Sequence, residues 1–160
     1  MKTLDITVLQ NGLDTIEDCI QHNKVINTDV SKVNVSWHLD HSLKVINSVI
    51  KNMQNSDSAL YIDNFSFLGK ALLKLKFFPR GKAKAPEYVM PSEAILVDDI
   101  KTQLVEARQN IKTIPNLDKN AFFKHPLFGN VNTSRVIRFL DVHTNHHLKI
   151  VKRILKYSSN

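Results

Sequence analysis

Two histidines occupy positions of an apolar seam in the last long helical segment, which runs from Thr133 to Lys156. Apolar residues repeat there at steps of three and four, a pattern typical of a helix packed in a bundle. His143 and His147 interrupt this pattern, although a buried imidazole carries polar nitrogens that need partners. Four helical residues separate the two rings by about 6 Å along the axis and about 40° around it. Their nitrogens can therefore converge on one point, as in a metal site. The seam consists of Val136, Leu140, His143, His147, Ile150 and Ile154.

A third nitrogen ligand can come from the segment 35–54, which also has the periodicity of an amphipathic helix. His38 and His41 lie on a strip beside its apolar face. Either one, together with the C-terminal pair, would give a three-nitrogen site inside a helical bundle, with positions left open for water or substrate. Asp40 and Asp141 are close enough in sequence to be candidates for orienting the rings. The apolar face consists of Leu39, Leu43, Ile46, Ile50 and Met53.

The remaining candidates for chemistry are weaker. His125 precedes Pro126, which favours an extended backbone, so we expect a structural turn before the last helix. His22 has no neighbouring group that would recruit it into a site. Cys19 is the only cysteine, and a lone cysteine on a helix face is more often a small buried hydrophobe than a nucleophile. No phosphate-binding glycine loop, nucleophile elbow or paired CxxC motif is present, which argues against nucleotide hydrolases, serine hydrolases and zinc fingers.

Composition predicts a single helical domain over residues 1–160. Hydrophobic residues make up 42% of the 160 residues, with only 4 glycines and 5 prolines, as expected of a compact and ordered chain. One cysteine excludes an internal disulfide and favours a reducing compartment. No apolar run approaches the roughly 20 residues that cross a membrane, and the first residues lack the apolar core of a signal peptide. We therefore predict a cytoplasmic protein without a membrane partner.

The formal net charge is +7, which raises the possibility of a nucleic-acid partner. Part of this charge lies near the C-terminus, off the apolar seam, where the helix dipole favours cations. No zinc-finger spacing, aromatic RNA-binding motif or helix-turn-helix accompanies the charge, so nucleic-acid binding is disfavoured. The C-terminal cations are Lys149, Lys152, Arg153 and Lys156.

Four long helices are predicted, and the fold class is therefore all-α, with a four-helix bundle as the default architecture. We place the helices at about 13–25, at 35–54, after Pro91 with Ser92 as the cap, and from about 132 to 157. Few segments show the strict alternation of a strand.

A long connection, residues 55–90, separates the second and third long helices. An extra helix is predicted through 71–75, followed by a basic loop at 77–86 bounded by prolines. Loops of this length in compact domains are often functional. Arg80, Lys82 and Lys84 are candidates to bind a carboxylate or phosphate of a substrate; the alternative is a solvated loop.

Three segments together resemble the DinB-like superfamily, and more closely a domain-of-unknown-function branch of it that is common in bacteria. They are Trp37-His-Leu-Asp-His-Ser-Leu, His125-Pro-Leu-Phe-Gly and His143-Thr-Asn-His-His. The resemblance extends from the first helix to the last. It implies a four-helix bundle of up-down-down-up topology, with a divalent metal, nickel or zinc, held by three histidines.

The resemblance places the metal ligands at His41, His143 and His147, with His38 as the rival for the first position. His146, beside the pair, is expected to point sideways into an interface or solvent. Some members of the superfamily are thiol-dependent enzymes, among them bacillithiol S-transferases and mycothiol-dependent isomerases.

The resemblance therefore implies a metal-dependent S-transferase or hydrolase that acts on a small molecule, with a thiol such as bacillithiol as a candidate cofactor. A second copy of the chain, in a homodimer, is a further candidate partner, because related bundles often pair through helix faces. The alternative is a non-catalytic binding or structural bundle with hydrogen-bonded histidines. An enzyme should have an open cavity above the three rings, whereas a structural protein should have the rings packed shut.

Overall fold

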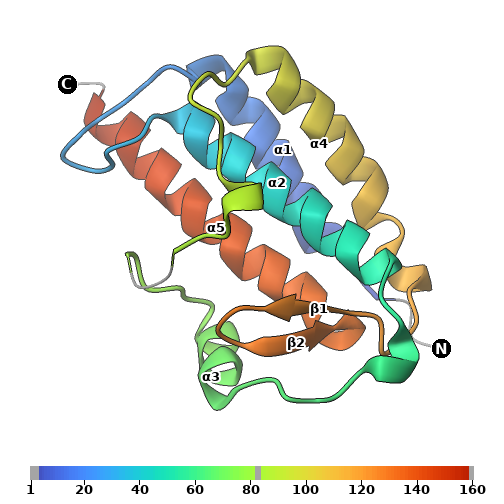
Figure 1. The fold of residues 1–160 in the computed structure, drawn as a ribbon. Coiled ribbons are helices and arrows are strands. Elements are labelled where there is room, and N and C mark those ends of the chain that lie inside the picture. The colour runs from blue at the N-terminus through green and yellow to red at the C-terminus, as the bar shows by residue number, and fades with distance from the viewer. Residues whose placement is uncertain (1–3, 82–83, 159–160) are drawn as a thin grey trace.

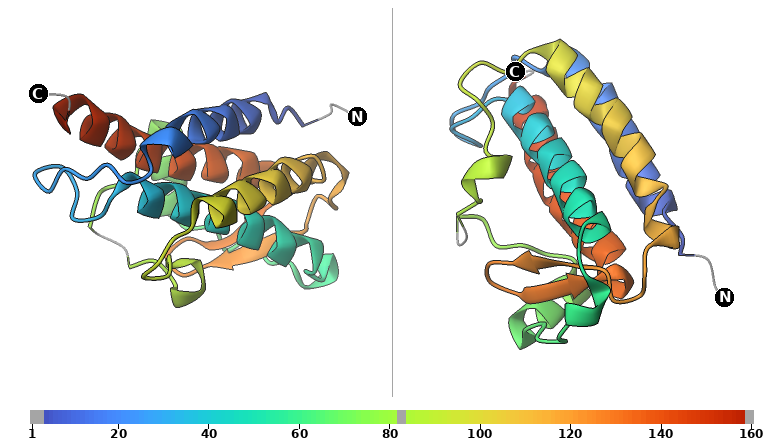
Figure 2. Two further views of the ribbon diagram at one scale, coloured as in Figure 1. Left: turned by 90° about the horizontal axis from the view of Figure 1, so that it is seen from above. Right: turned by 45° about the vertical axis from the view of Figure 1, so that its right-hand side comes forward.

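Four long helices form a bundle in the structure, a computed structural model that describes residues 4–81 and 84–158. α1 and α4 form one layer, and α2 and α5 form a second layer packed against it (Figure 2). α1 and α5 run in one direction, and α2 and α4 run in the opposite direction (Figure 1). Within the described residues, no helix has the length and apolar character that spanning a membrane requires. The bundle helices are α1 Thr7–Cys19, α2 Val35–Gln54, α4 Val97–Ile111 and α5 Thr133–Ser158.

The predicted boundaries of α2 and α5 are confirmed. The side chain of Asn34 accepts a hydrogen bond from the Trp37 amide and so caps the start of α2. The core between the two layers is made of fully buried aliphatic side chains from all four helices. Burying each of these side chains favours folding by about 1.5–3 kcal/mol. Examples are Leu13, Leu43, Ile100 and Leu140.

The predicted boundaries of the other two bundle helices are wrong. α1 begins six residues before the expected Leu13 because Leu9 is already buried on the same face. It ends at Cys19, where a 3₁₀ turn, Ile20–His22, follows. Ser92 does not cap α4, whose first helical residue is Val97; its hydroxyl donates instead to the Ala94 carbonyl.

A β-hairpin corrects the all-α expectation, since the fold is mostly helical but not entirely so. β1 (Phe122–His125) and β2 (Gly129–Asn132) pair antiparallel, with Phe122 opposite Asn132 and His125 opposite Gly129. Each strand has four residues and does not alternate strictly between buried and exposed positions, so the sequence lacks the usual signal of a strand. The hairpin lies over the end of the bundle where α5 begins (Figure 1).

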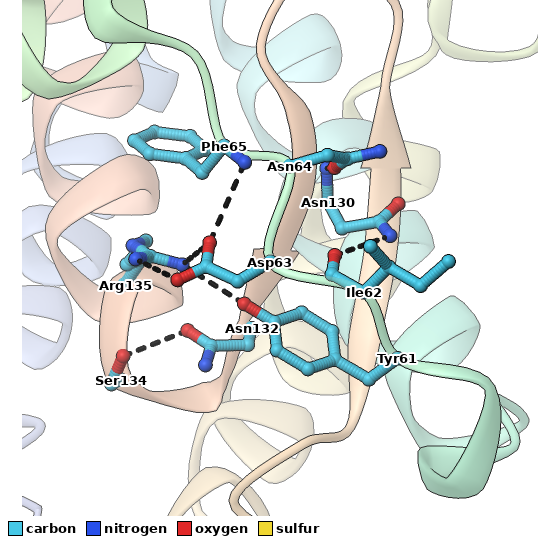
Figure 3. A network of polar contacts seen from close by, with 9 residues as sticks. All are labelled: Tyr61, Ile62, Asp63, Asn64, Phe65, Asn130, Asn132, Ser134 and Arg135. Carbon is cyan, nitrogen blue, oxygen red and sulfur yellow. Dashed lines mark hydrogen bonds and ion pairs between the residues drawn. The ribbon is translucent and has the colours of Figure 1, made fainter.

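The long connection is ordered where it meets the hairpin, and it contains the predicted extra helix as α3, Phe67–Leu75. Arg135, near the start of α5, forms a two-pronged ion pair with Asp63, at 2.9 and 3.0 Å (Figure 3). Asn64 accepts from the Asn130 amide at 2.7 Å, and the Asn130 side chain donates to the Ile62 carbonyl (Figure 3). These bonds fasten the chain before α3 to both β2 and α5.

Candidate metal centre

Three histidines from two helices converge on one point, as the sequence predicts. His41 comes from α2, and His143 and His147 come from α5, which packs beside α2. One ring nitrogen from each lies within 4.8 Å of the others. The ring centroids are 5.2 Å apart for His41 and His143, and 4.8 Å apart for each of the other two pairs. This group could hold a divalent metal ion, since imidazole is a common ligand of such metals.

The three rings lie on the outer face of the α2–α5 layer rather than in the centre of the bundle. Thr144, the neighbour of His143, faces Gly12 of α1, whereas His143 and His147 face away from α1 and line a pocket. The segment with the 3₁₀ turn Glu87–Val89 crosses over this face (Figure 1). The long connection is therefore part of the site.

A backbone carbonyl orients His41. Its Nδ1–H donates to the Val89 oxygen at 2.8 Å, which leaves the Nε2 lone pair free for a ligand. The Trp37 ring stacks on His41 with centroids 5.1 Å apart. Fixing one nitrogen in this way sets the tautomer and direction of the other, as outer partners do in metal sites.

A second histidine orients His147. The Nδ1 atoms of His38 and His147 are 3.0 Å apart, and the His38 Nε2 lies 3.1 Å from the Ser31 hydroxyl. If His147 donates to His38, and His38 donates to Ser31, the Nε2 lone pair of His147 is free. His38, the rival ligand in the sequence, lies outside the three-histidine group and is bonded to one of its members.

His143 has an unsatisfied ring nitrogen. Its Nδ1 is buried and has no hydrogen-bond partner among the described residues. An orphaned buried polar atom is costly and needs an explanation. A cation bound at Nδ1 would take up the lone pair of this nitrogen, so with Nδ1 as the ligand atom the missing partner fits a metal.

Burial keeps these imidazoles neutral. It is the main cause that lowers the pKa of His41, and it places the pKa values of His143 and His147 well below the ordinary value of 6.5. The pKa of His38 falls to about 4, mainly through burial and then through the charge of Arg80. Neutral rings offer lone pairs at neutral pH, which metal binding requires.

The carboxylates expected to orient the rings do not contact them. Asp40 pairs with Lys44 at 2.7 Å and accepts from Gln103 at 2.6 Å. Asp141 accepts from the Asn145 side chain at 2.6 Å. Both side chains are satisfied within their own surroundings, so a carbonyl and a histidine take the orienting role instead.

An open pocket of about 710 Å³ lies above the rings. Its walls come from α2, α3, the segments 78–81 and 84–90, the hairpin and α5, and most of its lining is apolar. An accessible cavity above three imidazoles is the arrangement expected of an enzyme rather than of rings packed shut. The apolar lining includes Leu72, Phe78, Val89, Phe123, Phe128 and Phe139.

The basic loop contributes two of its three predicted residues to this pocket. Arg80 lines it and donates to the Val30 carbonyl at 2.9 Å. Lys84 lines it near the surface, whereas Lys82 lies outside the described residues. The proximity of Arg80 to the histidines, and the position of Lys84 on the pocket lining, agree with a substrate-binding role, which stays a prediction.

Two further histidines line the pocket. His125 accepts from the Leu127 and Phe128 amides at 3.1 and 3.2 Å, so the predicted structural turn is present, and its ring also reaches the cavity. The expectation that His146 points into an interface or solvent is wrong, because the chain around Phe78 covers it and its ring lines the same pocket.

Sequence reasoning missed the residues that orient the rings. Ser31 and the Val89 carbonyl belong to connecting segments, and a backbone carbonyl has no residue-type signature. His146 had a usable signal, since it lies three residues after His143 and so on a neighbouring face of the same helix.

Known proteins do not assign this site: no family model, curated protein or solved structure matches the chain.

Proposed function

We propose that the protein is a divalent-metal-dependent enzyme of the DinB-like kind, with His41, His143 and His147 as the metal ligands. One observation supports this most strongly. Three neutral imidazoles converge at an open pocket, and one buried ring nitrogen has no partner within the described chain. Two ligands on one helix and one on the neighbouring helix hold the set in a rigid frame.

The arrangement of the bundle supports the DinB-like assignment. In chain order, the four long helices run up, down, down and up (Figure 1). The second and the last of these helices supply the three histidines. These features agree with the resemblance of the motifs around Trp37, His125 and His143.

Zinc or nickel is the proposed metal, since imidazole nitrogens suit both. When bound, such an ion acts as a Lewis acid and lowers the pKa of a water or thiol ligand. The chain's own contribution is positional, because the Val89 carbonyl and His38 orient two of the rings. We propose S-transfer or hydrolysis of a small molecule in the cytoplasm, with a low-molecular-weight thiol such as bacillithiol as co-substrate.

A non-catalytic bundle is the second candidate, and a specific observation favours it. His41 and His147 already have hydrogen-bond partners without any metal. Such a protein would need no ion for its histidines to be stable. This alternative leaves the Nδ1 of His143 without a hydrogen-bond partner among the described residues.

Elemental analysis by mass spectrometry on untagged protein tests the proposal. We expect near-stoichiometric zinc or nickel in the wild type and none in the His143→Ala/His147→Ala variant, with equal helix content by circular dichroism. His22→Ala is the matched control, because His22 is exposed on the 3₁₀ turn after α1. A wild type that takes up neither metal, even after incubation with both, would overturn the metal-dependent function.

A further inference from the structure

All the charged side chains that line the described pocket are basic. Arg80, Lys84 and Lys124 line it, and no aspartate or glutamate is found among its described lining residues. The chain has 15 acidic residues, so their absence here is not a matter of composition. A cleft with low-dielectric walls and charges of one sign concentrates ligands of the opposite sign. The pocket is therefore suited to an anion.

Aromatic side chains form a continuous wall beside the histidines. Phe139 stacks on His143 with centroids 6.2 Å apart, and Phe78 lies 6.0 Å from Phe139. Phe123 and Phe128 extend this wall, at 5.2 Å from Phe139 and 5.8 Å from Phe78. Binding an apolar or aromatic group against such a surface is favourable, because it removes apolar area from water. A small hydrophilic anion would leave most of it exposed to water.

Arg80 is held at the histidine end of the pocket. One of its terminal nitrogens donates to the Val30 carbonyl at 2.9 Å. The described chain provides no other partner for the guanidinium. Arg80 is close enough to His38 and His146 for its charge to lower their pKa values. A guanidinium fixed at one nitrogen is preorganised to bind a carboxylate through the others.

His125 adds a neutral donor. Two backbone N–H groups occupy its Nδ1, so the proton must sit on Nε2. Within the described chain, this Nε2–H has no hydrogen-bond partner. Stacking on Phe128, with the two rings 4.1 Å apart and within 9° of parallel, holds the imidazole in place. A polar donor on an otherwise aromatic wall can bind an oxygen of the ligand.

We propose that the pocket binds an amphipathic monoanion: an aromatic or branched apolar body packed on the phenylalanine wall, with a carboxylate at Arg80. Lys84 and Lys124 steer the anion from the rim, and His125 donates to an oxygen of the ligand. A pocket of about 710 Å³ is large enough for such a molecule. As a substrate assignment this rests on the proposed metal-dependent function; as a binding site it does not require the metal.

Three naphthalene probes of similar shape test the proposal by calorimetric titration: 2-naphthoate, 2-naphthylmethanol and 2-naphthylmethylamine. The titrations use chelator-treated and zinc-treated wild-type protein. We expect 2-naphthoate to bind the chelator-treated protein about tenfold or more tightly than the alcohol, with no binding of the amine. Equal affinity for the three probes, or no binding of 2-naphthoate to either form, would overturn the proposal. Because one arm contains no metal, a failure of metal binding is distinguishable from a failure of this site.

Substitutions of the basic lining residues test where the carboxylate of 2-naphthoate binds. Arg80→Gln should weaken the binding of 2-naphthoate about tenfold and leave the alcohol unchanged. The double variant Lys84→Gln/Lys124→Gln should weaken the binding of 2-naphthoate less than Arg80→Gln does. It should also make this affinity less dependent on salt concentration. Lys112→Gln is the control, because Lys112 is an exposed cation that does not line the pocket. If neither pocket variant changes the affinity for 2-naphthoate while its fold is intact, the carboxylate does not bind where we place it.

Discussion

The Nδ1 atoms of His38 and His147 lie 3.0 Å apart, so the two rings must share one proton between them. Both neutral imidazoles are buried, and two unprotonated nitrogens facing each other would repel. A metal at His147 selects the arrangement in which His147 donates and His38 accepts. The neighbouring Ser31 hydroxyl completes it by accepting from the other nitrogen of His38.

Replacing His38 should therefore weaken metal binding without removing a ligand. We expect His38→Leu to lower the affinity for zinc by about 10–100-fold, the effect usual for a partner that orients a ligand. Competition with a chromophoric chelator measures it. His22→Leu, at an exposed position, should leave the affinity unchanged. An affinity of His38→Leu equal to that of the wild type would show that His38 does not orient His147.

The only tryptophan of the chain reports on the same site. Trp37 stacks on His41 with centroids 5.1 Å apart and lies 6.2 Å from His147. An open-shell ion such as Co²⁺ quenches a nearby indole, whereas Zn²⁺ has a filled shell and lacks that route. We expect Co²⁺ to reduce the emission of Trp37 with one-to-one stoichiometry, and excess Zn²⁺ to restore it. Quenching that persists in His143→Ala/His147→Ala would mean that the ion binds elsewhere.

Features of the fold that depend on a local sequence pattern are predicted well, and features that depend on contacts between distant residues are not. Helical periodicity is local and strong in α2 and α5, so the boundaries of both helices and the two-helix origin of the histidines follow from it. Four-residue strands carry no comparable signal, and the hairpin was missed. Its turn was recognised through His125 and Pro126, but not the pairing on either side.

The surroundings of the rings were predicted less well than the rings themselves. Proximity in sequence suggested Asp40 and Asp141 as orienting groups, yet both bind polar side chains elsewhere. The actual partners are the Val89 carbonyl, 48 residues from His41, and His38, 109 residues from His147. The first contact depends on how the long connection folds over α2, and the second on how α2 and α5 pack together; no local pattern encodes either.

Gly129 should be the least replaceable glycine in the hairpin region. Its φ is +80°, and a Cβ there would lie 2.6 Å from the Asn64 carbonyl oxygen. We expect Gly129→Ala to destabilise the fold by about 1–3 kcal/mol through strain and steric overlap. Urea unfolding followed by circular dichroism measures this.

Gly12 is the matched control for that substitution. It lies within α1, and its added Cβ would meet the Thr144 methyl group at an ordinary 3.5 Å. Gly12→Ala should therefore stabilise the protein by about 0.5–1 kcal/mol, since alanine is the better helix former. Similar losses for both variants would contradict the distinction.

The ion pair between Asp63 and Arg135 should make the anchoring of the long connection depend on pH. Arg135 is the main cause that lowers the pKa of Asp63 below its ordinary value of 3.8. A carboxyl whose folded pKa is depressed contributes stability above its unfolded pKa, and this contribution is lost as pH falls through the folded pKa. Asp63→Asn should thus lower Tm at pH 7, and the difference from wild type should shrink progressively as the pH falls below about 4. Thermal unfolding across this range measures it, with Asp18→Asn as the control because the Asp18 carboxylate has no ion-pair partner within the described residues. A difference that persisted undiminished at pH 2 would show that the charge of Asp63 is not what holds the segment before α3 to α5.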